Sequence, residues 1–168
     1  VEDASVHVLD ETGEPLYVQG YFMDITERVQ REQRQNALRD IAETASAAED
    51  MHAFYAEIHR IVGELMYADN CFIALYDEQR GAVRFPYYVD EVDHEIPDPN
   101  AWEPLGDTEL GRGLTAHVLR TGRPLLVDRE LDAELQASGE VEPVGTDSVD
   151  WLGVPLRAEG RTLGALVV

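Results

Sequence analysis

The spacing of apolar residues changes from a strand-like to a helix-like period early in the chain. Alternating apolar and polar residues predict two strands, over residues 5–9 and 16–23, that are joined by a polar turn. Residues 26–48 lack Gly and Pro and are rich in Arg, Gln, Glu and Ala, which favour a helix. The chain therefore begins with a predicted β-hairpin and a long polar helix, and Asp24 stands where the cap of that helix is expected.

An apolar stripe predicts a second helix over residues 51–66. Its members recur at spacings of three and four, which places them on one helical face. They are Met51, Phe54, Tyr55, Ile58, Ile61, Val62, Leu65 and Met66. Such a stripe is typical of an amphipathic helix that packs one face into a protein core.

The rest of the chain is predicted to alternate short strands with short helices. Gly, Pro and acidic clusters separate apolar runs that are too short for a single long helix. The expected elements are a hairpin over 71–89, a long acidic loop over 90–109, a helix over 113–122, a strand over 124–128, a helix over 129–139 and a hairpin over 150–168 that turns at Glu159 and Gly160. This order predicts an α+β fold, an antiparallel sheet flanked by helices.

The amino-acid composition limits the kinds of molecule that the chain is expected to bind. The sequence has 168 residues, 44% of them hydrophobic, which is enough for one full core and a small additional piece. Its 34 acidic and 13 basic residues give a net charge of -21, and every basic residue is Arg. Phosphate groups would be repelled, so neither nucleic acid nor an anionic membrane surface is an expected partner.

The acidic charge itself has more than one interpretation. A solvated acidic surface is the simplest, and adaptation to high salt is a second, because carboxylates keep a surface hydrated when charge repulsion is screened. The use of Arg without Lys also fits a GC-rich genome. No apolar run approaches the ~18 residues of a membrane span. The single cysteine, Cys71, excludes an internal disulfide and suggests a reducing cytoplasm.

Three motifs carry a resemblance to a known family. They are LMYADNCFIALYDE, GRGLTAHVLRTGRPLLVDRE and DSVDWLGVPLRAEGRTLGALVV, and they occur in the family's order and spacing. Together they resemble a GAF domain over residues 49–168, with its profilin-like antiparallel sheet. The resemblance implies a small-molecule sensing or dimerisation module.

The start of the chain resembles a different sensory domain. The segment LDETGEPLYVQGYFMDITERVQREQ is similar to the closing hairpin of a PAS domain and its outgoing helix, with DITER as the marker. The implied organisation is the end of a PAS domain over 1–26, a connecting signalling helix over 27–48 and a GAF domain over 49–168. In such proteins the output is a histidine kinase, a diguanylate cyclase or another output domain. We therefore expect this chain to be an excerpt of a longer protein with an output domain downstream.

The resemblance also implies a ligand pocket between the sheet and the elements that cover it. The residues expected to line it are Phe72, Tyr76, Phe85, Tyr87, Trp102, Leu114, His117 and Val118. For each of them ordinary core packing is the simpler interpretation. The sequence names no ligand and no cofactor.

Other candidate chemistry is weaker. Gly111, Arg112 and Gly113 open a helix, where backbone N–H groups could hold an anion, although simple helix entry is the favoured interpretation. His52 and His59 lie seven residues apart without a third ligand, so no metal site is predicted. No nucleophile with its base, phosphate loop or multi-cysteine relay occurs, so we do not expect an enzyme.

The function predicted from sequence is therefore a cytoplasmic bacterial sensor segment that binds a small molecule and relays a signal through its helices. The alternative is a ligand-free spacer that only dimerises and relays. A homodimer is predicted through residues 27–66. Its seam in the connecting helix would be Leu38, Ile41, Ala45 and Ala48, which follow a three-four-three spacing.

Overall fold

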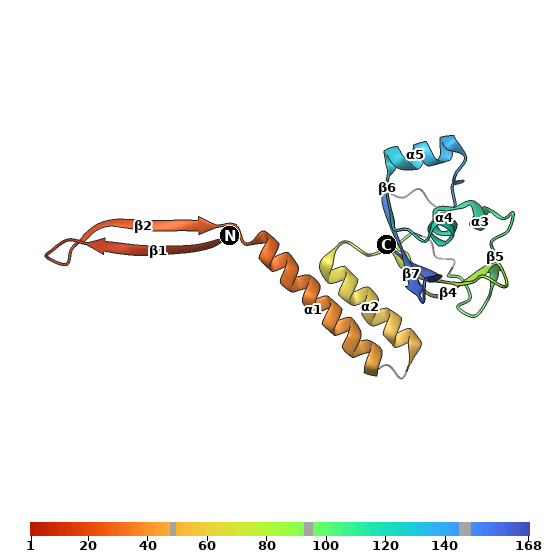
Figure 1. Cartoon of the computed structure of the whole chain (residues 1–168), viewed down its shortest axis with the longest axis horizontal. Helices are drawn as coiled ribbons and strands as arrows, with labels where there is room; N and C mark the ends of the chain where they lie inside the picture. The colour runs from red at the N-terminus through yellow and green to blue at the C-terminus, as the bar shows by residue number, and fades with distance from the viewer. Residues whose placement is uncertain (48–49, 93–95, 145–148) are drawn as a thin grey trace. The chain divides into compact units, whose positions relative to one another are not determined.

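The structure is a computed structural model that describes residues 1–47, 50–92, 96–144 and 149–168. The chain divides into two compact units, Val1–Ser46 and Ala47–Val168. Figure 1 shows the elements of each unit along the chain. The division falls close to the predicted start of the GAF-like region at residue 49.

The first unit contains the predicted hairpin and long helix. Strand β1 (Glu2–Leu9) pairs antiparallel with β2 (Pro15–Met23), and helix α1 spans Thr26–Ala47. The carboxylate of Asp24 accepts hydrogen bonds from the backbone N–H of Thr26 at 2.9 Å and from its hydroxyl at 2.6 Å. Asp24 thus marks the change from strand to helix, as the sequence predicts.

The second unit is built on a six-stranded antiparallel sheet, which confirms the predicted fold class. The strands lie in the order β5-β4-β3-β8-β7-β6. They are β3 (Cys71–Asp77), β4 (Ala82–Val89), β5 (Glu103–Pro104), β6 (Leu125–Asp128), β7 (Asp150–Ala158) and β8 (Arg161–Val167). The loop expected over residues 90–109 thus contains a short edge strand, β5, because Glu103 and Pro104 pair with the start of β4.

Within the described residues of this unit, four helices accompany the sheet. They are α2 (Met51–Leu65), α3 (Glu109–Arg112), α4 (Leu114–Thr121) and α5 (Arg129–Ser138). Gly122 ends α4 in the left-handed conformation, with φ of 60°, which glycine adopts without strain. The β7–β8 turn at Glu159 and Gly160, with φ values of 51° and 79°, is also where the sequence predicts it.

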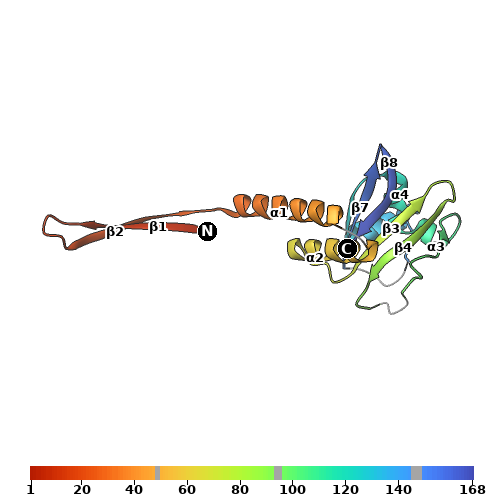
Figure 2. The same ribbon diagram turned by 90° about the horizontal axis from the view of Figure 1, so that it is seen from below.

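The two faces of the sheet carry separate hydrophobic cores, and Figure 2 shows α2 and α4 on opposite sides of it. The core on the α4 face consists of Ala74, Val83, Phe85, Val118, Leu119, Ala165 and Val167. The core on the α2 face consists of Cys71, Ile73 and Tyr87, with Tyr55 and Ala56 of α2 packed against it. Strand residues alternate between faces, so β3 contributes to both.

A bulge in β4 changes which face its residues occupy. Ile73 of β3 is opposite Tyr87, but Leu75, two residues later, is opposite Arg84, three residues earlier in β4. The extra residue lies around Pro86, which has no N–H to contribute to the ladder. As a result Phe85 joins the α4 core while Tyr87 joins the α2 core.

Candidate functional site

The predicted pocket residues on the α4 face form a packed aromatic layer. The ring of Phe72 lies 5.7 Å from that of Phe85 and stacks on Tyr88 at 5.5 Å, measured between ring centroids. Val118 of α4 has no exposed surface, and Tyr76 and Trp151 pack around the same core. The structure therefore brings Phe72, Tyr76, Phe85 and Val118 together, with Leu114 and His117 half-buried on the same helix α4.

Two of the predicted pocket residues lie elsewhere. Tyr87 faces α2 because of the bulge, on the opposite side of the sheet from Phe85. Trp102 precedes β5, where its ring lies near the guanidinium groups of Arg80 and Arg84, at 5.3 and 5.4 Å from the ring centroid. The eight predicted pocket residues thus lie in three separate places: six on the α4 face, Tyr87 on the α2 face and Trp102 before β5.

The segment from Gly111 to Gly113 uses its polar groups internally. The hydroxyl of Thr108 accepts a hydrogen bond from Gly111 N at 3.1 Å, and Arg120 donates to the Gly111 carbonyl at 2.8 Å. The guanidinium of Arg112 pairs with Glu142 at 2.7 Å. Anion binding by these residues stays a prediction, since it would compete with these existing partners.

A polar link on the α2 face joins helix α2 to the sheet. His59 of α2 contacts the Tyr87 hydroxyl through Nδ1 at 2.8 Å and the Ala68 carbonyl through Nε2 at 2.5 Å. A carbonyl only accepts, so Nε2 carries the proton, and a neutral ring then accepts the Tyr87 O–H at Nδ1. Burial raises the pKa of Tyr87, which keeps its hydroxyl protonated as a donor.

Two further titratable side chains, those of His52 and Cys71, lie near Tyr87. The His52 ring lies 5.7 Å from the Tyr87 ring, and the buried thiol of Cys71 lies in the same core. Burial raises the pKa of Cys71 to about 11, so the thiol stays protonated and unreactive at neutral pH. Within the described parts of the chain, no three His, Cys, Asp or Glu side chains are grouped as metal ligands.

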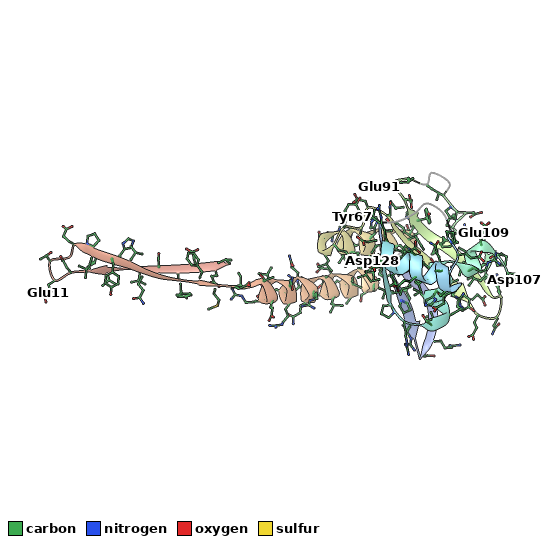
Figure 3. All side chains as sticks on the ribbon, turned by 90° about the horizontal axis from the view of Figure 1, so that it is seen from above. Glu11, Tyr67, Glu91, Asp107, Glu109 and Asp128 are labelled. Carbon is green, nitrogen blue, oxygen red and sulfur yellow. The ribbon has the colours of Figure 1, made fainter. Side chains whose placement is uncertain are left out.

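An open pocket of about 590 Å³ lies beside the C-terminal end of α2. His59, Gly63, Met66 and Tyr67 are among its lining residues. The Tyr67 hydroxyl donates to the Glu91 carboxylate at 3.0 Å, and this bond is the main reason that the pKa of Tyr67 rises to about 12. Figure 3 shows both labelled side chains on the same side of the unit.

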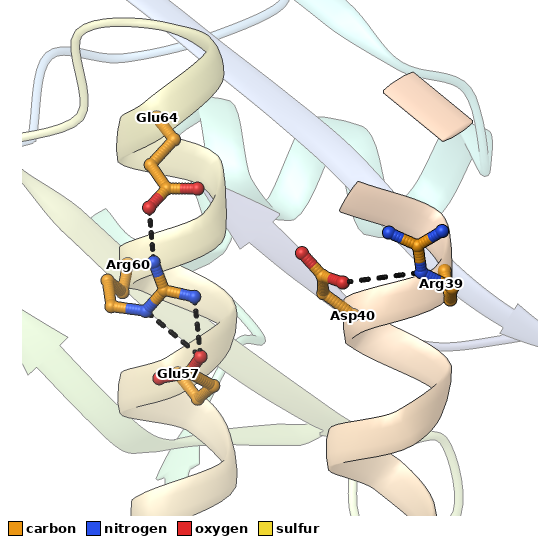
Figure 4. A network of polar contacts seen from close by, with 5 residues as sticks. All are labelled: Arg39, Asp40, Glu57, Arg60 and Glu64. Carbon is orange, nitrogen blue, oxygen red and sulfur yellow. Dashed lines mark hydrogen bonds and ion pairs between the residues drawn. The ribbon is translucent and has the colours of Figure 1, made fainter. Parts of the chain in front are cut away.

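The charged side of α2 is separate from its core-facing side. Arg60 lies between Glu57, at 2.7 Å, and Glu64, one turn away on either side (Figure 4). The bond from Arg60 lowers the pKa of the Glu57 carboxyl. These groups are exposed, as are those of the Arg39–Asp40 pair on α1, so such pairs contribute little stability and mark solvent-facing positions.

The sequence did not identify the His59–Tyr87 link or the position of Arg84. His52 and His59, seven residues apart, signal that both lie on one face of α2. No pattern within the sequence indicates which sheet residue that face meets. In the described ranges, no helix is both long and apolar enough to cross a membrane.

Comparison with known proteins agrees with this architecture. The family model described as the GAF domain matches residues 48–168. A GAF domain of a phosphoenolpyruvate-protein phosphotransferase from Coxiella burnetii is 19% identical, with a TM-score of 0.61 and coverage of 81% of this chain and 76% of that one. The corresponding domain from Acinetobacter is 20% identical, with a TM-score of 0.60 and coverage of 80% and 75%.

A third similar structure is the A. aeolicus nlh2 GAF domain in an inactive state, at 13% identity and a TM-score of 0.57, covering 82% of this chain and 79% of that one. No curated protein sequence matched the chain. At these identities the structures establish a shared fold. Because the family model covers well over half of the residues, the chain belongs to the family of GAF domains, which are common sensory and regulatory modules of signalling proteins.

Proposed function

We propose that this chain is the sensory segment of a bacterial signalling protein of the histidine kinase or diguanylate cyclase type, located in the cytoplasm. Residues 49–168 bind a small molecule on the α4 face and pass the binding signal to α2. The first unit supplies the end of a PAS domain and the connecting helix. The segment is not itself an enzyme, and the protonated, buried thiol of Cys71 is consistent with that role.

The observation that carries this proposal is the bulged pairing of β3 with β4. Two residues of β4 that are separated only by Pro86 contribute to opposite cores. Phe85 packs in the α4-face core, and Tyr87 is hydrogen-bonded to His59 of α2. A ligand that displaces Phe85 therefore changes the position of Tyr87 through three consecutive residues of backbone. Packed cores respond to such shifts by changing between discrete arrangements, which is how a small displacement becomes a signal.

The ligand-free spacer is the second candidate, and a specific observation favours it. Phe72, Phe85 and Val118 pack into one continuous core. Neither the pocket beside α2 nor the one next to Trp102 is lined by any of them. In this alternative, the same bulged strands relay strain between helices without a bound molecule.

A double-mutant cycle tests the relay across the sheet. Val118→Ala alters the α4 face, and His59→Gln alters the α2 link; the free energy of unfolding is measured by urea denaturation for each variant and for the pair. Sites without shared partners add within ~0.5 kcal/mol. We expect a coupling of about 1 kcal/mol, larger than that of the control pair Val141→Ala and His59→Gln. Strict additivity in both pairs would contradict the relay.

A further inference from the structure

A pocket of about 510 Å³ lies beside Trp102 and has no role in the proposed relay. Its lining includes Leu75, Gln79, Arg84, Trp102, Arg161 and Leu163. Arg84 pairs across the ladder with Leu75, which packs in the α2-face core, so both residues project from that face of the sheet. None of the fully buried residues of the α4-face core lines this pocket, although Tyr76, which packs against that core, does.

Two arginines line this pocket, Arg84 and Arg161, and Arg84 is the one that forms no ion pair with the described residues. Its Nε is inaccessible to solvent and has no hydrogen-bond acceptor among them. By contrast, Arg80 pairs with Asp77 at 3.2 Å, and Arg161 lies 3.9 Å from Glu159. A guanidinium that is partly removed from water without an acceptor is unfavourable, so the position calls for a negatively charged partner.

The surroundings hold Arg84 in place. Val83 pairs with Glu103 of β5, which fixes the preceding residue, Trp102, at the edge of β4. The Arg84 guanidinium lies 5.4 Å from the Trp102 ring centroid, a distance at which a cation is attracted to the ring. An arginine fixed on a strand and against an aromatic ring is preorganised for binding, because little side-chain freedom remains to be lost.

We propose that this pocket binds the carboxylate of a small organic monoanion. The carboxylate accepts hydrogen bonds from the Arg84 guanidinium, the pairing for which arginine is best suited. Leu75 and Leu163 offer apolar surface for a compact hydrocarbon body. A doubly charged phosphate is disfavoured because, among the described residues, Arg84 is the one arginine of the pocket lining without an ion pair. Asp77 and Glu78 also line the pocket, and the chain carries a net charge of -21.

The test uses benzoate as the probe and the whole chain, labelled with ¹⁵N. The chain has two tryptophans, so its NMR spectrum has two indole N–H signals, and Trp102→Phe identifies that of Trp102. We expect benzoate to shift the Trp102 signal saturably and to leave that of Trp151 unchanged. Benzamide, the uncharged analogue, should give no saturable shift, and inorganic phosphate should bind more weakly than benzoate.

Variants assign the binding to Arg84. Loss of a hydrogen bond to a charged group weakens affinity by roughly tenfold or more, so Arg84→Gln should raise the Kd for benzoate at least that much. Arg84→Lys, which keeps the charge but not the planar fork, should weaken binding less and decides the question if the Gln variant does not fold. The matched control Arg123→Gln, an exposed arginine after α4, should stay within about twofold.

Several results would overturn the proposal. They are the absence of a saturable shift with wild type, an equal response to benzamide, tighter binding of phosphate, or a Kd for benzoate that neither Arg84 variant changes. None of these results decides whether a ligand binds at the α4 face, since the substituted residues, Arg84, Trp102 and Arg123, lie outside that core.

Discussion

The His59–Tyr87 hydrogen bond gives a direct test of how α2 is held on the sheet. Tyr87→Phe removes only the hydroxyl. Residue 87 is 8% exposed, so its ring stays packed in the α2-face core. The Nδ1 atom of His59 then loses the partner that lies at 2.8 Å. A buried acceptor left without a donor costs ~1–3 kcal/mol, and since His59 is half-buried we expect about 1 kcal/mol.

Urea denaturation followed by circular dichroism measures this loss, and a thermal scan should show a fall of about 3–5 °C for a domain of this size. Tyr76→Phe is the matched control. It removes the hydroxyl of a half-buried tyrosine on β3 that has no hydrogen-bond partner among the described residues. Its stability should stay within ~0.5 kcal/mol of wild type.

The pH dependence adds a second readout. Burial raises the pKa of Tyr87 above its ordinary value of 10.0, so the unfolded phenol ionises before the folded one. The stability that Tyr87 contributes is therefore complete below pH 10 and declines as the pH rises through the higher folded-state pKa. Equal stability of Tyr87→Phe and wild type at neutral pH would refute the proposed role of this bond.

Three other predictions concern the core, the α3 segment and the dimer. Burial raises the pKa of Cys71 to about 11, so between pH 9 and 11 wild type should lose about 2 kcal/mol more unfolding free energy than Cys71→Ala, measured in urea at each pH. Gly111→Ala should destabilise by at least ~2 kcal/mol because its Cβ would lie 1.7 Å from a backbone oxygen, whereas Gly106→Ala, with open space around it, should be near neutral in the same assay. Light scattering should show a concentration-dependent dimer that Ile41→Asp weakens; a mutant dimer as tight as wild type would exclude the predicted seam.

The predicted dimer seam lies on helix α1. Leu38 of the seam is 68% exposed and Ile41 is half-buried, so an apolar side chain is available on α1. Ala48, the last member of the predicted seam, lies outside the described residues. Dimerisation through residues 27–66 is therefore a prediction for the scattering experiment to decide.

The sequence could predict those elements whose signals are local. The apolar stripe of α2 and the glycine that ends α4 define these helices without knowledge of their neighbours. Strand β5, with two residues, and helix α3, with four, are too short to leave a periodic signal, so the sequence suggested only a loop over much of this region.

The candidate site shows where local signals end. Phe85 and Tyr87 are two residues apart and were expected to line one pocket, but a bulge is defined by the pairing of two strands and not by one of them. That the Arg84 Nε has no hydrogen-bond acceptor among the described residues likewise depends on the folded surroundings and not on the local sequence. Sequence reasoning thus named candidate residues and could not assign them to the faces of the sheet.

Native mass spectrometry of the freshly purified chain tests the central claim, that the domain binds a small molecule on the α4 face. The sensor proposal predicts a fraction of molecules with additional mass that is lost on denaturation. It also predicts that Val118→Ala, which alters the α4 face, reduces that fraction while Arg84→Gln does not. A wild-type chain that carries no additional mass and gains none on incubation with a cell metabolite extract would contradict the sensor proposal and favour the ligand-free spacer.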